Sequence, residues 1–301
     1  MGTVVEVRNL EKRYGTYVAV EDVTFSVDEG EIFGILGPNG AGKTTTVESL
    51  QGLRAINGGR VEVLGLDPRT AADAIRRRIG SQLQESALPD RIKVWEALEV
   101  FSALNPNGPP WSDVMQQWGL AEKRDSTFGS LSGGQQQRLF VALALVNDPE
   151  LVFLDEMTTG LDPSSRRVAW DLIRQIRDGG TTVILVTHFM DEAEHLCDRL
   201  IVIDDKRVVA EGSPQDLIDR YGGGVRVRFG YDGPDLSWLA GIPHVASVER
   251  ERRGYTVTGD GPLLAHVGAA LVEHGLEPND LRLERASLED VFLALTDGDN
   301  S

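Results

Sequence analysis

Of all segments in this chain of 301 residues, GPNGAGKT at residues 37–44 most restricts the fold that the chain can adopt. It matches the pattern G-x-x-x-x-G-K-[ST], and it stands between a short apolar run at residues 32–36 and a helical pattern at residues 44–51. Backbone N–H groups in such a turn point at an anion, and the dipole of the following helix favours negative charge there. This order predicts a phosphate site in an α/β fold, although the segment read alone could be an ordinary glycine-rich turn.

Each residue type in this loop has a defined task in nucleotide binding. Backbone N–H groups of the loop would surround a β-phosphate, and the ammonium of Lys43 would reach the β- and γ-phosphate oxygens. The hydroxyl of Thr44 would bind Mg²⁺. ATP and Mg²⁺ are therefore the expected cofactors, and the residues expected around the phosphates are Gly37, Pro38, Asn39, Gly40, Ala41, Gly42, Lys43, Thr44 and Thr45.

The segment LVFLDE at residues 151–156 supplies the carboxylates that such a site needs. Four apolar residues followed by two acidic ones indicate a buried strand that ends at the carboxyl edge of the sheet, where α/β folds bind ligands. Asp155 is expected to hold Mg²⁺, and Glu156 is expected to orient and deprotonate an attacking water. Acidic residues often end a strand, but together with the loop at residues 37–44 they predict ATP hydrolysis.

The segment LSGGQQQR at residues 131–138 places a serine and two glycines directly before a helix. Two adjacent glycines cost conformational entropy, so a helix start avoids them unless something must approach the backbone closely. The apolar pattern from Gln135 onward predicts a mostly buried helix. Its first N–H groups lack partners within the helix, so Ser132, Gly133 and Gly134 are expected to face an anion.

The order of apolar runs indicates how the chain is organised. Runs at residues 151–154 and 182–186 flank a helical pattern at residues 165–178, which is typical of a parallel sheet in an α/β core. Two alternating segments in the first thirty residues predict a small antiparallel sheet, and residues 85–130 predict a helical insertion. After the glycines at 222–224 we expect a small α+β domain, with strands at 225–229, 245–250 and 255–258, a helix at 262–274, and a last helix that Ser287 and Asp290 open as a capping box.

Composition excludes several classes of protein. The net charge of −17 argues against a surface for nucleic acid, which would need concentrated Lys and Arg. No run approaches the ~20 apolar residues of a membrane-spanning helix. The first residues do not show the pattern of a signal peptide. The whole chain has one cysteine, so no intrachain disulfide is expected.

With LSGGQ standing between the phosphate loop and the Asp-Glu strand, the chain resembles the ATP-binding subunit of ABC transporters from about Val4 to Leu217. The resemblance implies a P-loop NTPase cassette over residues 1–221, with a RecA-like core, an antiparallel β subdomain and a helical subdomain at about 85–130. Residues 222–301 would then be a small accessory or regulatory α+β domain.

The resemblance also assigns roles to four further residues. Tyr14 resembles the aromatic residue that stacks on adenine, although it could be a core tyrosine. Gln84 resembles the glutamine that contacts Mg²⁺ and the catalytic water, with Gln82 as the nearby alternative. His188 follows a core strand and resembles the switch histidine that contacts the γ-phosphate, and Asp162 in TTGLDP resembles a residue at the contact between subunits. Met157 departs from the family, which usually has proline there.

In this family the signature of one subunit faces the phosphate loop of another. The resemblance therefore implies that Ser132, Gly133, Gly134 and Gln135 contact ATP held by a second copy of the chain, in a head-to-tail dimer that closes on ATP and opens after hydrolysis. It also implies a separate transmembrane permease as partner, which would hold the chain at the cytoplasmic face of the membrane.

Other members of the superfamily act in DNA repair, chromosome maintenance and translation. The coiled-coil insertions, zinc cysteines or second cassette of those classes have no counterpart in this sequence. A regulatory module that binds ATP without hydrolysing it is a further alternative. The presence of Lys43, Asp155 and Glu156 argues against it. The tail segment SLEDVFLAL at 287–295 resembles drug- and antibiotic-export ATPases of the daunorubicin-resistance type, so we expect export of a drug, antibiotic or lipid-like substrate rather than import.

Overall fold

The computed structural model describes residues 2–82, 88–104 and 108–296. The chain forms two compact units, Met1–Pro214 and Gln215–Ser301. This division falls a few residues before the boundary expected at 221/222, which stays a prediction.

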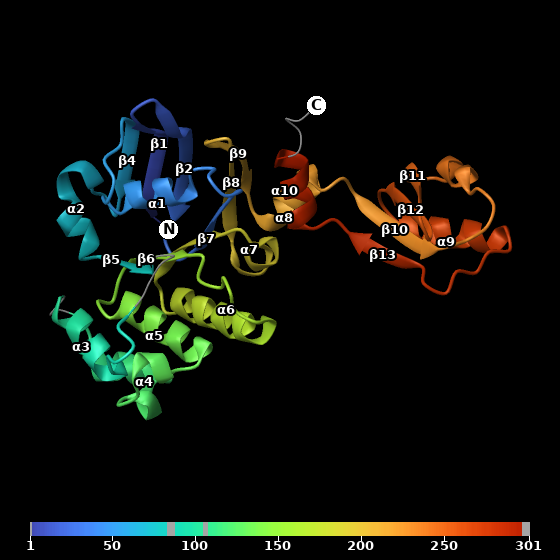
Figure 1. Cartoon of the computed structure of the whole chain (residues 1–301). Helices are drawn as coiled ribbons and strands as arrows, with labels where there is room; N and C mark the ends of the chain where they lie inside the picture. The colour runs from blue at the N-terminus through green and yellow to red at the C-terminus, as the bar shows by residue number, and fades with distance from the viewer. Residues whose placement is uncertain (1, 83–87, 105–107, 297–301) are drawn as a thin grey trace. The chain divides into compact units, whose positions relative to one another are not determined.

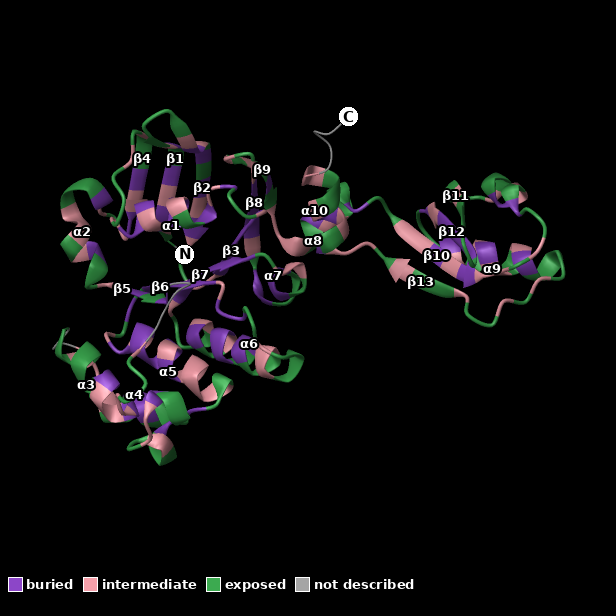
Figure 2. Cartoon of the chain, in the orientation of Figure 1, coloured by how far each residue is buried: buried purple, intermediate pink, exposed green. Residues whose placement is uncertain are grey.

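The central sheet of the first unit has six strands in the order β5-β6-β7-β3-β8-β9 (Figure 1). All neighbours are parallel except β8 and β9, which are antiparallel. Every residue of β3, β6 and β7 is buried, as expected for strands covered on both faces (Figure 2). The strands are β3 (Ile32–Leu36), β5 (Ile79–Gln82), β6 (Leu151–Asp155), β7 (Thr182–Thr187), β8 (Arg199–Asp204) and β9 (Arg207–Gly212).

A second, antiparallel sheet of three strands has the order β2-β1-β4 and confirms the expected sheet near the start of the chain. Its strands are β1 (Thr3–Tyr14), β2 (Tyr17–Asp28) and β4 (Gly58–Val63). The two sheets share one hydrophobic core, in which Phe25 of β2 stacks on Phe33 of β3 with ring centroids 5.4 Å apart. Val47 and Leu50 of α1 (Lys43–Leu50) join this core, which fixes the helix that follows the phosphate loop.

Helices lie on both sides of the central sheet. In Figure 1, α3, α4, α5 and α6 lie below the sheet, whereas α1 and the antiparallel strands lie above it. The expected helical insertion at 85–130 contains α3 and α4 in its described part, and the helix expected at 165–178 is α6. The remaining helices of this unit are α2 (Pro68–Arg76), α3 (Val94–Ala103), α4 (Trp111–Gln117), α5 (Gly133–Leu145), α6 (Pro163–Asp178) and α7 (Met190–Leu196).

The second unit contains a four-stranded antiparallel sheet in the order β11-β12-β10-β13. Apolar side chains of β10 and β12 form a small core with α9. The three strands expected in the tail are confirmed, whereas β13 was not expected because its sequence RLER holds a single apolar residue. The elements are α8 (Pro214–Tyr221), β10 (Val225–Gly230), β11 (Val245–Glu251), β12 (Gly254–Gly259), α9 (Leu263–Glu273), β13 (Arg282–Arg285) and α10 (Leu288–Thr296).

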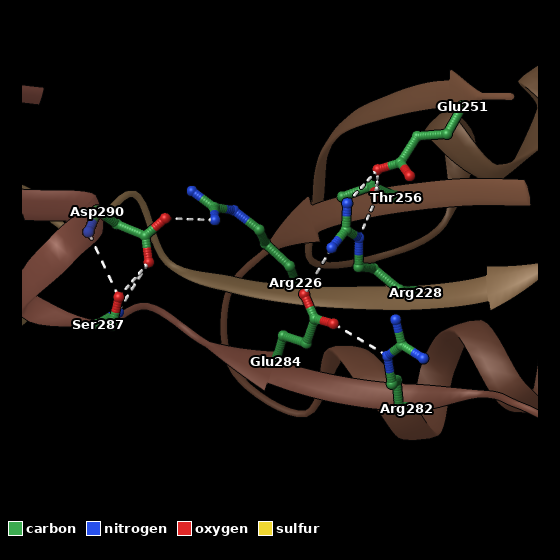
Figure 3. A network of polar contacts seen from close by, with 8 residues as sticks. All are labelled: Arg226, Arg228, Glu251, Thr256, Arg282, Glu284, Ser287 and Asp290. Carbon is green, nitrogen blue, oxygen red and sulfur yellow. Dashed lines mark hydrogen bonds and ion pairs between the residues drawn. The ribbon is translucent and has the colours of Figure 1, made fainter. Parts of the chain in front are cut away.

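Polar side chains link the sheet of this unit to its last helix (Figure 3). Arg228 of β10 donates to Thr256 at 3.0 Å and pairs with Glu251 and Glu284. Arg226 pairs with Asp290 at 2.6 Å, and Asp290 also accepts from the backbone N–H of Ser287 at 2.9 Å. The expected capping box is therefore confirmed, and its carboxylate anchors α10 to β10.

Candidate active site

Three loops meet at the carboxyl ends of adjacent strands. Because β6, β7 and β3 are parallel neighbours, the segments that follow Leu36, Asp155 and Thr187 emerge at the same edge of the sheet. They surround a cleft of about 540 Å³. The predicted site residues that line this cleft are Tyr14, Asn39, Gly40, Gly42, Lys43, Thr44, Thr45, Glu156 and His188.

The phosphate loop needs glycine at two positions where the backbone passes close to neighbouring carbonyls. A Cβ on Gly42 would lie 2.6 Å from the carbonyl oxygen of Ala19, and its φ of +109° is in the region that favours glycine. A Cβ on Gly37 would lie 2.2 Å from the carbonyl oxygen of Ile203. Gly42 also precedes α1 without a side-chain cap, so the first N–H groups of this helix remain available to an anion in the cleft.

The ammonium of Lys43 lies within the loop itself. Lys43 is only 6% exposed, and its Nζ donates to the carbonyl oxygens of Gly37 at 2.8 Å and Pro38 at 3.1 Å. Burial lowers the pKa of Lys43, and the nearby carboxylates of Glu156 and Asp155 oppose this effect. A bound phosphate would replace the loop carbonyls as the acceptor of these hydrogen bonds. It would also add negative charge next to the buried ammonium of Lys43.

Asp155 has a buried oxygen without a partner. The residue is 4% exposed, and its Oδ1 makes no hydrogen bond in the described structure. Desolvation, followed by the negative charge of Glu156, raises the pKa of Asp155 to about 6, and Lys43 partly offsets this. Burying a carboxylate oxygen without a partner costs free energy, so Oδ1 of Asp155 is suited to bind a cation.

The donor set at this position suits Mg²⁺. The hydroxyl of Thr44, which lines the cleft, and the carboxylate of Asp155 are both oxygen donors. Over the described ranges, no three His, Cys, Asp or Glu side chains gather into a metal cluster. Mg²⁺ does not need one, because proteins usually hold it through one or two side chains together with phosphate and water.

Glu156 and His188 meet in the cleft from two neighbouring strands. The Nδ1 of His188 lies 3.2 Å from the Oε1 of Glu156. Glu156 has a φ of +49°, a conformation that non-glycine residues rarely adopt, and its backbone N–H donates to Val186 of β7 at 2.9 Å. A proline at position 157 would disfavour helical backbone angles at the preceding residue, so the buried Met157 leaves Glu156 freer to adopt this conformation.

Tyr14 lies at the turn between β1 and β2 and is 40% exposed, so it is not a core tyrosine. Its ring lies 4.8 Å from the Nζ of Lys12 and 5.8 Å from the Cζ of Arg54. Tyr17, which pairs with Tyr14 across the turn, also lines the cleft, as does Thr159. We did not expect either residue, because the alternating pattern around Tyr17 indicates only a strand and the role implied for TTGLDP was assigned to Asp162 rather than to Thr159.

The signature segment lies outside this cleft. Ser132 caps α5: its Oγ accepts from the N–H of Gln135 at 3.4 Å, and its own N–H donates to the side chain of Gln135 at 3.0 Å. Apart from the adjoining backbone of α5, a Cβ on Gly133 or Gly134 would meet no atom of the described residues within 4 Å. Packing within the chain therefore does not require glycine at either position.

Two other predicted site residues also lie away from the cleft or beyond the described residues. Asp162 caps α6, and hydrogen bonds from Ser164 and Ser165 hold the pKa of its carboxyl well below its usual range. Gln84 lies outside the described residues. The alternative glutamine, Gln82, is buried on β5 and accepts a hydrogen bond from Gln137 of α5 at 3.4 Å.

None of the described helices combines the length and the apolar character that crossing a bilayer requires.

Comparisons with known proteins agree with this geometry. A family model described as ABC transporter matches residues 20–159. The chain is 38% identical to daunorubicin resistance ATP-binding protein DrrA3 of Streptomyces coeruleorubidus, covering 99% of this chain and 97% of that protein. It is 39% identical to Nod factor export ATP-binding protein I of Burkholderia orbicola (strain AU 1054), covering 97% and 96%.

Solved structures show the same fold. The cassette cbiO1 of Clostridium perfringens, part of the ABC transporter complex cbiONQ, matches with a TM-score of 0.66 and 26% identity over 73% of this chain and 92% of that chain. The ADP conformation of the cassette MJ1267 matches with a TM-score of 0.65 and 23% identity over 72% and 93%. These matches confirm the predicted cassette fold, and the full-length relatives show that the chain belongs to the ATP-binding proteins of ABC transporters, which are nucleotide-binding ATPases.

Proposed function

We propose that the chain is the ATP-hydrolysing subunit of an exporter, in which a second copy completes the catalytic site and a separate permease carries the substrate. The observation that carries this proposal is the cleft in which Lys43, Glu156 and His188 come together at the edge of the sheet. The experiment that tests the catalytic assignment is the Glu156→Gln variant, argued in the Discussion.

In the proposed mechanism, the phosphate loop and Lys43 hold the triphosphate. Thr44 and Asp155 would hold Mg²⁺, which when bound neutralises charge on the phosphate oxygens. The carboxylate of Glu156 orients a water and accepts its proton, and His188 holds that carboxylate through the 3.2 Å contact while it faces the γ-phosphate. Tyr14 supports the adenine ring by stacking.

The second copy supplies the signature segment. The open surroundings of Gly133 and Gly134 support this step, because glycines that the chain's own packing does not need are suited to the close approach of a phosphate. Ser132 and Gly134 of one copy would contact the γ-phosphate bound to the other. Asp162 caps α6 beside this contact. Its carboxylate accepts hydrogen bonds from the backbone N–H groups of Ser164 and Ser165, which stabilise the turn.

The relatives favour export over import and over the non-transport alternatives. They are drug-resistance and Nod-factor-export ATP-binding proteins, and they match both the cassette and the tail of this chain. We infer that the substrate is a drug, an antibiotic or a lipid-like molecule. Copurification of the chain with its permease, followed by transport assays in vesicles, tests this inference.

A groove on the first unit is suited to the permease. It has a volume of about 440 Å³ and is lined by Gln51, Leu53 and Arg76 and by Phe101 and Leu104 of the helical insertion. Leu53 is 50% and Leu104 77% exposed, whereas the buried amide of Gln51 has no hydrogen-bond partner within residues 2–82, 88–104 and 108–296. The apolar contact area and the amide of Gln51 favour a cytoplasmic segment of the permease that is apolar and carries a polar group.

Substitution of Leu53 or Leu104 by glutamate tests this docking site. Both side chains are exposed, so each variant should fold and hydrolyse ATP within about twofold of the wild type when isolated. Copurification with the permease should fall by roughly tenfold, because a charge would replace apolar contact. Val272→Glu on α9 changes an equally exposed residue (60%) and should copurify normally. Normal copurification of both groove variants would place the permease elsewhere.

We also propose that residues 222–301 serve assembly or regulation rather than nucleotide binding. No predicted site residue lies beyond His188, so chains that end after Pro214 or after Tyr221 should bind ATP within about twofold of the full chain. The longer form retains α8, in which Leu217 is buried. Nucleotide affinity and ATP-dependent dimerisation, measured side by side, test this proposal. Unchanged dimerisation would reject the assembly role, and lost affinity would show that the boundary is wrong.

A further inference from the structure

Glu192 of α7 is a buried carboxylate that the mechanism does not use. Among the described residues, Asp155 and Glu192 are the buried carboxylates, and Glu192 is 0% exposed. Its Oε1 accepts a hydrogen bond at 3.0 Å from the indole Nε1 of Trp170 on α6. A buried charge is costly, and a hydrophobic residue of similar volume often serves stability as well or better. Packing alone therefore does not explain the residue.

Two threonines adjoin the same carboxylate. Thr158 and Thr187 are both fully buried, and Thr187 also accepts a hydrogen bond from the N–H of Phe189 at 3.0 Å. Burial raises the pKa of Glu192, and the side chains of Thr187, Thr158 and Trp170 oppose this effect. In the part of the chain that the structure describes, the Oε2 of Glu192 and the hydroxyl of Thr158 make no hydrogen bond of normal geometry, so a small movement of either segment changes how well this carboxylate is satisfied.

Each neighbour of Glu192 belongs to a segment that carries a predicted site residue. Thr158 follows Glu156 by two positions, and Thr187 directly precedes His188. Trp170 lies on α6, the helix that Asp162 caps. The carboxylate of Glu192 therefore lies beside Thr158 in the segment after β6, beside the last residue of β7, and beside α6, the helix that Asp162 caps.

Arg166 reinforces the connection from the solvent side. Its guanidinium carbon lies 4.2 Å from the centroid of the Phe189 ring, and its Nη1 pairs with Asp191 at 3.3 Å. Arg166 also lies on α6, so the residue after His188 is tied to the same helix as Glu192. The segment around His188 is thus held to α6 from two sides.

We propose that Glu192 is a positioning residue, which links the segment after β6 and the end of β7 to α6 and thereby maintains the contact between Glu156 and His188. This inference rests on the proposed roles of those two residues. Glu192 does not touch ATP and acts only through the geometry of the cleft. It also gives the subunit contact near Asp162 a physical route to the catalytic carboxylate.

The Glu192→Gln variant of the full chain tests the proposal. Glutamine keeps the volume and one oxygen for Trp170, but it replaces the other oxygen by a donor and removes the charge. We expect kcat for ATP hydrolysis to fall by roughly 10-fold to 100-fold, because small misplacements of catalytic groups have effects of that size. The Kd for ATP should stay within about twofold, since the phosphate loop is untouched. Glu194→Gln makes the same chemical change at an exposed position of the same helix and should keep kcat within about twofold.

A double variant separates positioning from a general loss of stability. If Glu192 acts through the contact of Glu156 with His188, adding Glu192→Gln to His188→Ala should lower kcat by less than about twofold further. A multiplicative loss in the double variant, or wild-type kcat in folded Glu192→Gln, would overturn the proposal. Trp170→Phe removes only the indole donor, should lower kcat in the same direction, and serves as the test if Glu192→Gln does not fold.

The single variants distinguish a failure of the catalytic roles of Glu156 and His188 from a failure of the positioning role of Glu192. If Glu156→Gln and His188→Ala hydrolyse ATP normally, the proposed catalytic roles fail and this inference fails with them. If both lose hydrolysis while Glu192→Gln does not, only the positioning role is wrong.

Discussion

The Glu156→Gln variant is expected to bind ATP, to form a stable dimer in its presence, and to hydrolyse it more slowly by on the order of 10²-fold or more. Glutamine keeps the size of the side chain and an oxygen that can face Nδ1 of His188, but it cannot accept a proton from water. All contacts to the phosphates remain, so ATP should bridge two copies that are not released. Light scattering with and without ATP measures the dimer, and phosphate release measures hydrolysis.

Glu150→Gln is a matched control for this variant. Glu150 directly precedes β6, at the other end of the strand from Glu156, and it pairs with Arg78 at 2.6 Å near the surface. The same chemical change there should leave turnover and dimerisation at wild-type values. Wild-type turnover in Glu156→Gln would mean that another group takes the proton, and a monomer in ATP would reject closure by nucleotide bridging.

The parts of the site that could be predicted from sequence are those that local patterns determine. The phosphate loop is one continuous segment, and the apolar runs before Gly37, Glu156 and His188 indicate buried parallel strands. Parallel strands bring their carboxyl ends to one edge, so the meeting of these three segments follows from the strand pattern alone. The order of strands and the 3.2 Å contact between Glu156 and His188 depend on packing between distant segments, which no local pattern specifies.

The burial of Glu192 could not be predicted from the sequence. In MDEAEHL it stands among charged residues and reads as part of a solvated helix face, yet it is fully buried beneath Trp170. Its neighbours Asp191 and Glu194 are exposed, so only the packing of α7 on α6 distinguishes it from them. The unpaired oxygen of Asp155 is similar: the strand predicts a buried carboxylate, but only the structure shows that no group among the described residues satisfies it.

Lys43→Ala and two signature variants are expected to separate nucleotide binding from assembly. Lys43→Ala removes a charge directed at the β- and γ-phosphates, so ATP affinity should fall by roughly 10-fold or more, in line with the usual value of a charged hydrogen bond. Ser132→Ala should leave ATP binding by one copy nearly unchanged and reduce hydrolysis. Equilibrium binding of a fluorescent ATP analogue at protein concentrations below dimerisation, beside steady-state turnover, measures both.

The Gly134→Ala variant makes this comparison sharper, because Ser132→Ala also removes a helix cap, which costs about 0.5–2 kcal/mol. Beyond the backbone of its own helix, an alanine at position 134 meets no atom of the described residues, and within a helix alanine is favoured over glycine by about 1 kcal/mol. The isolated subunit should therefore be at least as stable as the wild type and bind ATP normally. Hydrolysis should still fall by roughly tenfold, because the new methyl group would obstruct the phosphate held by the partner copy. Normal hydrolysis in Gly134→Ala would show that nothing approaches this glycine, and lost binding by the monomer in either signature variant would show that the segment acts on its own chain's nucleotide.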